Sequence, residues 1–141
     1  MDYKALTGKQ ERLNRLMNLH FVSFFGDLPL TSTQALALEF IMQKAAVGEV
    51  YQKDLEAFLS IRGSSVTSLI NNLERDGYIR RESVKFDGRY KHLAPTEKAL
   101  SRQAEISKRI DQYMESLFVG IPEGDLKVFE SVLEKMTRNV R

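Results

Sequence analysis

Residues 62–77 decide the fold of this 141-residue chain and read RGSSVTSLINNLERDG. Apolar side chains recur there at Val66, Leu69, Ile70 and Leu73, the i, i+3, i+4, i+7 spacing of one face of an α-helix. The opposite face carries short hydroxyl and amide side chains, although Glu and Lys are more usual on a solvated helix. Because such small groups fit closely against base edges, we interpret this segment as a DNA-recognition helix. A polar surface without a partner is the alternative interpretation.

The segment before this helix favours a helix-turn-helix. Residues 52–59 have the pattern of a short amphipathic helix with Leu55, Phe58 and Leu59 on its inner side. Residues 60–63 then form a tight turn into the recognition helix. Two short helices joined in this way are typical of DNA-binding helix-turn-helix proteins.

A β-hairpin is predicted directly after the recognition helix. Gly77 follows the last apolar position and is expected to stop the helix. Residues 78–86 and 89–94 have the composition of strands, with Asp87 and Gly88 between them. Asp-Gly between two strands is a strong hairpin signal, so this segment is expected to form the wing of a winged helix.

The charge of the chain is concentrated on this hairpin. The formal net charge of +2 is too small to indicate a nucleic-acid partner by itself. Residues 80–91, however, contain five basic and two acidic side chains, a local charge of +3 (5 − 2). A basic segment beside a polar helix face is the charge distribution that a DNA-binding surface requires.

Two helices are predicted before the helix-turn-helix. Residues 9–28 carry one wide apolar stripe, and Pro29 ends that helix because it disfavours helical backbone at the preceding residue. Thr31 and Gln34 have the spacing of a capping box, so the second helix is expected to begin just after Thr31. Gly48 is expected to close it as a left-handed cap.

Two further helices follow the hairpin. One is predicted from a Thr96 cap to about Phe118. The residues expected on its apolar side are Leu100, Ala104, Ile110, Met114, Leu117 and Phe118. In the last, over residues 126–140, apolar side chains alternate at spacings of three and four, a heptad-like seam that requires a partner helix. The residues expected at a dimer contact are Leu13, Leu16, Leu117, Phe118, Leu126, Phe129, Leu133 and Met136.

These patterns predict a mainly α chain with a small β-hairpin wing, in one domain over residues 1–141. Residues 31–95 would form the winged helix-turn-helix lobe. Residues 1–30 and 96–141 would supply the dimerisation helices.

Several function classes are disfavoured by composition. Cysteine is absent, which excludes disulfides, thiolate nucleophiles and thiol redox switches, and makes a reducing cytoplasm the expected compartment. No segment has the roughly 18 apolar residues of a membrane span, and residues 1–4 do not open a signal peptide. His20 and His92 lack an accompanying nucleophile, metal-ligand cluster or phosphate loop, so no enzyme activity, cofactor or metal is expected.

The order and spacing of five short segments resemble a known family. The segments are Leu30-Thr31-x-x-Gln34, Asp54-Leu55, Ile61 through Leu73, Gly77-Tyr78-Ile79-Arg80-Arg81, and Asp87-Gly88-Arg89 leading to Leu93-Ala94-Pro95-Thr96. Together they resemble the MarR family of bacterial transcription regulators, which carry a winged helix-turn-helix. The resemblance extends over most of the chain in element order.

The resemblance implies positions for individual side chains. Ser64, Ser65 and Ser68 would lie toward the major groove, and Arg89 would enter the minor groove and be oriented by Asp87. A narrow minor groove attracts a guanidinium because its negative potential is enhanced. Asp87 also has a simpler interpretation as a turn residue. The complete set of expected DNA contacts is Arg62, Ser64, Ser65, Thr67, Ser68, Asn71, Lys85, Asp87, Gly88, Arg89 and Lys91.

Three positions depart from the family pattern. Gly63 stands where a basic residue is frequent, Glu56 where a small residue is common, and Pro95 where Leu often precedes the Thr. The first removes an expected DNA contact, and the other two change packing. They affect the expected affinity and site preference more than the expected fold.

The function expected from this sequence is that of a homodimeric repressor of a pseudo-palindromic double-stranded DNA operator. A winged helix that binds protein without sequence-specific DNA binding is the alternative. His20 and Phe24 would line the pocket of a small aromatic or amphipathic ligand that releases the DNA, since family members are known for such sites. The simpler interpretation of His20 is a hydrogen-bonded histidine near a helix crossing.

Overall fold

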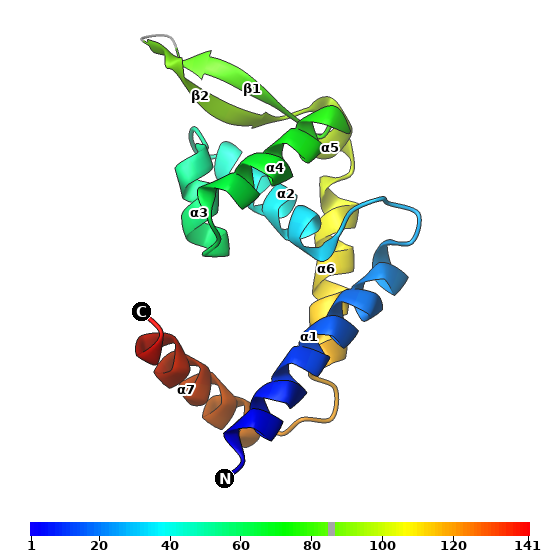
Figure 1. The fold of residues 1–141 in the computed structure, drawn as a ribbon. Helices are drawn as coiled ribbons and strands as arrows, with labels where there is room; N and C mark the ends of the chain where they lie inside the picture. The colour runs from blue at the N-terminus through cyan, green and yellow to red at the C-terminus, as the bar shows by residue number, and fades with distance from the viewer. Residues whose placement is uncertain (85–86) are drawn as a thin grey trace.

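The computed structural model describes residues 1–84 and 87–141, with side chains described outside residues 84–90. It is mainly helical with a two-stranded antiparallel hairpin, as predicted. The elements are α1 (Tyr3–Phe25), α2 (Ser32–Ala45), α3 (Gln52–Leu59), α4 (Gly63–Arg75), β1 (Ile79–Val84), β2 (Asp87–Pro95), α5 (Glu97–Ser101), α6 (Gln103–Leu117) and α7 (Glu123–Asn139). Figure 1 shows a winged lobe of α2, α3, α4 and the hairpin, connected through α6 to a lower part made by α1 and α7.

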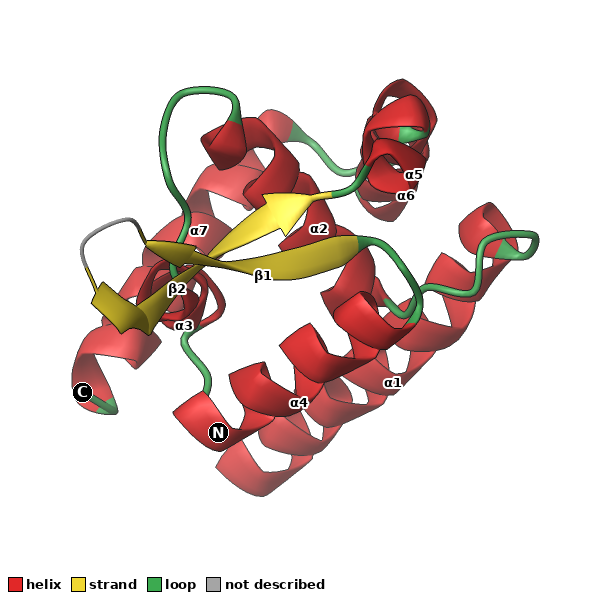
Figure 2. Ribbon diagram, turned by 90° about the horizontal axis from the view of Figure 1, so that it is seen from above, coloured by secondary structure: helices red, strands yellow, loops and turns green. Residues whose placement is uncertain are grey.

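The core of the winged lobe is built around α2, which is apolar on nearly all sides. Its Leu38 and Ile41 are fully buried in one cluster with Leu55 of α3 and Ile70 and Leu73 of α4. In Figure 2 the hairpin lies over α2, and α4 contacts its first strand. Burial of each such side chain stabilises the fold by roughly 1.5–3 kcal/mol, so α4 is held firmly on its apolar face.

The predicted helix boundaries around the turn motif are confirmed at two places. Gln34 N–H donates to Thr31 Oγ1 at 3.2 Å, and Thr31 N–H donates to Gln34 Oε1 at 3.0 Å, which completes the capping box of α2. Gly77 has a φ of +81° and ends α4, while Tyr78 N–H donates back to the Leu73 carbonyl at 2.9 Å. Only glycine adopts this φ without steric cost, so Gly77 sets the direction in which the hairpin leaves the helix.

Two details near α3 differ from the prediction. Gly48 is not in the left-handed region, because α2 already ends at Ala45. The left-handed residue is instead Ser60, with a φ of 53°, at the end of α3. Phe58 is 49% exposed rather than inward, and it stacks on Phe40 with ring centroids 4.4 Å apart. Helical spacing predicted Phe58 on the apolar face of α3. Its side chain instead packs on the ring of Phe40 at the surface of α2.

The helix predicted from residue 96 to about 118 is broken. Thr96 caps α5 as expected, but Arg102 has φ −106° and ψ 4°, and α6 begins after it. The break changes which side chains face the core. Leu100 and Ala104 are exposed, so their predicted place on the apolar side was wrong. Ile110 is buried as predicted, and Ile106, which was not predicted, is fully buried.

Asp87 and Gly88 do not form the turn that was predicted between the strands. The two strands pair antiparallel with a register shift between Ser83 and Val84. Val84 of β1 pairs with Asp87 of β2, and residues 85–86 lie outside the described residues. Asp87 and Gly88 therefore belong to β2 instead of forming the turn. A register irregularity of this kind changes the pairing without leaving a clear composition signal.

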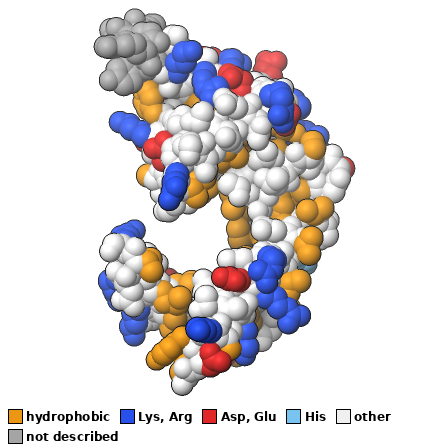
Figure 3. All heavy atoms as spheres, viewed as in Figure 1, with side chains coloured by type: hydrophobic (Ala, Val, Ile, Leu, Met, Phe, Trp, Pro, Cys, Tyr) orange, Lys and Arg blue, Asp and Glu red, His pale blue; other side chains and the backbone are white. Residues whose placement is uncertain are grey.

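Apolar side chains remain exposed on α1 and α7. Leu13 and Leu16 of α1 and Phe129, Leu133 and Met136 of α7 are each between 42% and 51% exposed. Among the described residues of α7 none is buried. Orange side chains are accordingly visible on the lower part of the molecule in Figure 3. Within the described residues, no helix combines the length and the apolar character needed to cross a bilayer.

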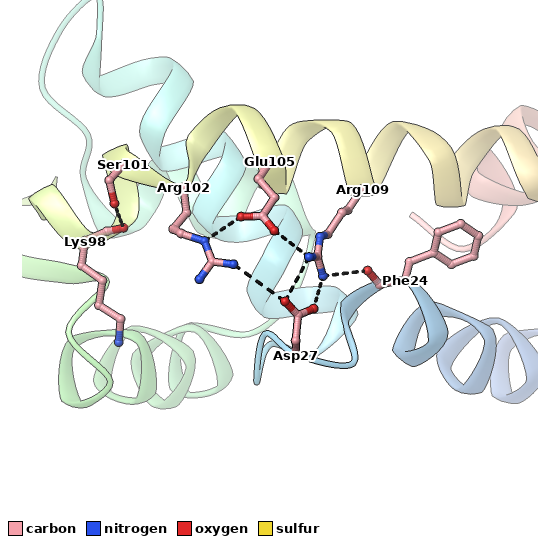
Figure 4. A network of polar contacts seen from close by, with 7 residues as sticks. All are labelled: Phe24, Asp27, Lys98, Ser101, Arg102, Glu105 and Arg109. Atoms are coloured by element: carbon pink, nitrogen blue, oxygen red, sulfur yellow. Dashed lines mark hydrogen bonds and ion pairs between the residues drawn. The ribbon is translucent and has the colours of Figure 1, made fainter.

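A network of ion pairs fixes the end of α1 on α6 (Figure 4). Arg109 donates to both carboxylate oxygens of Asp27, with Nη2 3.1 Å from Oδ2, and to the Phe24 carbonyl at 3.2 Å. It also donates to Glu105 Oε1 at 2.6 Å, and Arg102 Nε donates to Glu105 Oε2 at 2.7 Å. The Arg109 guanidinium lowers the pKa of Asp27, and Arg102 lowers the pKa of Glu105.

Replacing Asp27 with Asn is expected to lower the unfolding temperature at pH 7 by a few degrees and to have a smaller effect near pH 2.5. The pKa of Asp27 is lower in the folded state than in the unfolded state. The Asp27 carboxylate therefore contributes fully to the free energy of unfolding at a pH above its unfolded-state pKa, and this contribution is lost as the pH falls through its folded-state pKa. Circular dichroism at both pH values measures this. Glu123→Gln, which removes a surface pair with Lys127 on α7, is the control. An equal loss for Asp27→Asn at both pH values would contradict the role assigned to its charge.

Candidate nucleic-acid interface

Helix α4 exposes the polar face that the sequence predicts. Ser64, Ser65, Ser68 and Asn71 are exposed, while the apolar side of the same helix is buried. Arg62 is also exposed, at the N-cap of the helix. Figure 1 shows α4 at the front of the lobe, next to the hairpin. The short polar side chains therefore form a surface that a large ligand can reach.

Thr67 belongs to the contact between α3 and α4 more than to this surface. It is half-buried, and its hydroxyl donates to the Gly63 carbonyl and accepts from Gln52 Nε2, both at 2.9 Å. Because both bonds are internal, the hydroxyl of Thr67 holds the two helices of the turn motif together. The neighbouring serines, Ser64, Ser65 and Ser68, are exposed instead.

Two departures from the family pattern, Glu56 and Gly63, lie against each other. A Cβ added to Gly63 would be 2.8 Å from Glu56 Oε1, a distance that forces one of the groups to move. Gln52 Nε2 donates to the same oxygen at 3.1 Å and holds it in place. The two departures are therefore linked, because the carboxylate of Glu56 occupies the space beside Gly63 that a side chain at position 63 would need.

Arg81 of β1 joins the hairpin to α4. Its Nη1 donates to Glu74 Oε1 at 2.6 Å, and its backbone N–H donates to Glu74 Oε2 at 3.1 Å. Its Nη2 donates to Asn71 Oδ1 at 2.6 Å. No role was predicted for Arg81 beyond its place in the segment Gly77-Tyr78-Ile79-Arg80-Arg81. The available signal was strand alternation, which places Arg81 on the same face as the buried Ile79.

The base of the wing carries charged side chains on the outside. Lys91 of β2 is exposed, Arg80 Nε lies 2.7 Å from Glu82, and His92 Nε2 lies 3.3 Å from the same carboxylate. Lys and Arg side chains are visible on this face of the winged lobe in Figure 3. The predicted side-chain contacts of Lys85, Asp87, Gly88 and Arg89 lie outside the described residues.

His20 lies where α1 packs on α6. Its Nε2 is 2.8 Å from Ser116 Oγ, and its ring meets Phe24 edge-on with centroids 5.1 Å apart. Tyr113 is buried behind them, which raises the pKa of its hydroxyl. This arrangement agrees with a hydrogen-bonded histidine near a helix crossing. Within the described part of the chain, no three His, Cys, Asp or Glu side chains are placed to hold a metal ion.

Comparison with known proteins places this geometry in a family. The family model described as the MarR family matches residues 28–89, from the start of α2 to the wing. The structure of the transcription regulator MarR from Oenococcus oeni is 26% identical, covers 94% of this chain and 98% of its own, and superposes with a TM-score of 0.77. Over residues 28–89 the chain matches the MarR family. Its predicted fold class, a winged helix with a β-hairpin wing, is thereby confirmed.

Two more distant structures share the MarR fold over nearly the whole chain. The MepR–DNA complex from S. aureus is 21% identical, covers 99% of this chain and 98% of its own, and has a TM-score of 0.84. An organohalide-sensing transcriptional regulator in its 2,4-dichlorophenol-bound form is 15% identical, covers 96% of this chain and 79% of its own, and has a TM-score of 0.86. At these identities the similarity shows the fold alone.

Proposed function

We propose that this chain is a homodimeric repressor of the MarR family that binds a pseudo-palindromic operator. The observation that carries the proposal is the exposed face of α4. Ser64, Ser65, Ser68 and Asn71 offer short hydrogen-bonding side chains on a helix whose other face is anchored in the core. Side chains of this kind contact base edges in the major groove. The DNA-bound state of MepR, a protein with the same fold, supports the proposal.

The wing supplies the second contact in this proposal. Lys91 and Arg80 expose positive charge on the hairpin, and Arg89 would extend this charge into the minor groove with Asp87 as its orienting carboxylate. Electrostatic contacts of this type do not depend on the base sequence. They make the binding affinity depend on salt concentration, because they release counterions from the phosphates. Base preference would come from α4.

The dimer in this proposal is formed by α1, α6 and α7. Apolar side chains that remain half-exposed along α7 line a hollow together with Phe118. A helix with this seam is stabilised by burial against another helix. In a symmetric dimer the two α4 helices would face successive major grooves, about 34–36 Å apart.

Fluorescence anisotropy with labelled DNA tests the proposal. The fragments are taken from upstream of the chain's own gene and from its neighbours, and unlabelled nonspecific DNA is the competitor. At least one fragment is expected to bind tightly and to resist competition. If every fragment bound alike, the alternative of a winged helix that binds protein would be favoured.

A small ligand is proposed to release the DNA. The site would be the aromatic surroundings of His20 and Phe24, at the junction of α1 and α6. The 2,4-dichlorophenol-bound state of an organohalide-sensing regulator with the same fold supports a ligand of this class. Such a ligand acts only if it binds the non-operator conformation better than the DNA-binding one.

A phenol or an aromatic carboxylic acid is expected to weaken operator binding several-fold, and His20→Ala is expected to blunt that response. The His20 ring would lose both its Phe24 contact and its bond to Ser116. Anisotropy titrations with and without the compound measure both effects. Thr7→Ala, which removes an exposed hydroxyl from the distant end of α1, is the control. Peroxide should leave affinity unchanged because the chain has no cysteine, and thiol-reversible loss of binding would contradict this.

A further inference from the structure

Arg81 fixes the orientation of the Asn71 side chain on the exposed face of α4. Its guanidinium Nη1 donates to Glu74 Oε1 at 2.6 Å. The backbone N–H of Arg81 donates to Glu74 Oε2 at 3.1 Å, which keeps the Glu74 carboxylate beside the guanidinium. From this position its second terminal nitrogen, Nη2, lies 2.6 Å from Asn71 Oδ1. The side chain of Arg81 is only 23% exposed, so its freedom to move is limited.

The chemistry of the two groups leaves one arrangement of the amide. A guanidinium carries only N–H donors, so the Asn71 atom that faces it must be the carbonyl oxygen. The reversed amide would place N–H groups against N–H groups. The NH₂ group of Asn71 is therefore directed away from Arg81, and within the described residues it donates to no protein acceptor. Asn71 is exposed, so this group is accessible.

We infer that Asn71 contacts DNA as a hydrogen-bond donor only, and that Arg81 is the positioning residue that makes it so. The inference rests on the proposed function and adds a base preference to it. In the major groove, guanine offers two adjacent acceptors, O6 and N7, whereas the usual pairing of Asn with adenine needs the amide to donate and accept together. With its oxygen bound by Arg81, Asn71 selects guanine over adenine at the base pair it faces.

Asn71→Asp tests the donor role with minimal change in shape. The carboxylate keeps an acceptor for Arg81 but replaces the NH₂ group with a second acceptor, which repels guanine and accepts from cytosine N4. The probe is the tightest fragment bound by the wild-type protein, together with every single base-pair substitution in one half-site. At one position the wild-type preference for guanine, roughly tenfold, is expected to be lost and cytosine to become the preferred base.

Arg81→Gln tests the positioning role, and Arg80→Gln is its matched control. Both variants lose one positive charge from adjacent positions of β1, but Arg80 is exposed and pairs with Glu82 on its own strand. Without Arg81 the amide can turn, so guanine and adenine at that position are expected to bind within about threefold of each other. Arg80→Gln should retain the wild-type ranking of bases even if its overall affinity falls.

The outcomes separate this inference from the proposed function. If the wild-type protein selects a fragment but Asn71→Asp keeps the wild-type base ranking, the donor role is overturned while the proposed function stands. If Arg81→Gln is folded by circular dichroism and ranks bases as Arg80→Gln does, the positioning role is overturned. If Arg81→Gln does not fold, Asn71→Asp alone decides. A wild-type protein without any selected fragment would overturn both proposals.

Discussion

Replacing Leu133 with Glu is expected to convert the protein into a monomer and to abolish tight operator binding. Leu133 lies in the apolar seam of α7 and is 42% exposed in the single chain. In the proposed dimer both copies of the new carboxylate would be buried in an apolar contact. An uncompensated buried charge costs roughly 3–5 kcal/mol, so the dimer dissociation constant should rise by more than about a hundredfold.

Sedimentation velocity across micromolar concentrations measures this effect, and anisotropy on the selected fragment measures its consequence. Lys135→Glu is the matched control, because two residues along a helix correspond to a rotation of about 200° and Lys135 is not among the residues that line the hollow beside α7. It changes the net charge by more than Leu133→Glu does and should remain a dimer. A wild-type protein that sediments as a monomer throughout would contradict the proposed dimer.

Replacing Arg89 with Ala is expected to weaken operator binding at least tenfold and to lower the salt dependence of binding by about one unit of slope for each wing. Loss of a guanidinium from the minor groove removes an electrostatic contact that every sequence provides. Ser68→Ala should behave differently. It removes a hydroxyl from the exposed face of α4 and should change the preference among operator variants with little change in the salt slope.

Anisotropy titrations at several salt concentrations distinguish these effects. Lys108→Ala is the control, because it removes the same unit charge from an exposed position of α6. It should leave both affinity and slope nearly unchanged. If Arg89→Ala left affinity and slope at wild-type values on a bound operator, the assignment of the wing to the minor groove would be wrong.

Features set by neighbouring residues were predictable from the sequence. The buried face of α4 follows directly from helical spacing, and Gly77 and the Thr31 capping box mark helix ends through interactions within a few residues. The same holds for the exposed serines of α4, because a helix with one buried face must expose the other. The positions of these side chains needed no knowledge of distant contacts.

Features set by contacts between elements were missed. The clamp of Arg81 on Asn71 joins residues ten positions apart, and the fit of Glu56 against Gly63 depends on how α3 meets α4. The break at Arg102 interrupts a stretch with a continuous helical pattern, so spacing alone extended one helix through it. In each case the sequence contained suitable residues but not the geometry that brings them together.

Hydroxyl-radical footprinting of the protein on its tightest fragment tests the central claim most directly. A symmetric dimer that places α4 in successive major grooves predicts two matching protected half-sites related by a two-fold axis, with centres about one helical turn apart. The Leu133→Glu variant should lose this pattern, and Lys135→Glu should keep it. Protection that is uniform along the DNA, or confined to one half-site at saturating wild-type protein, would contradict operator recognition by a symmetric dimer.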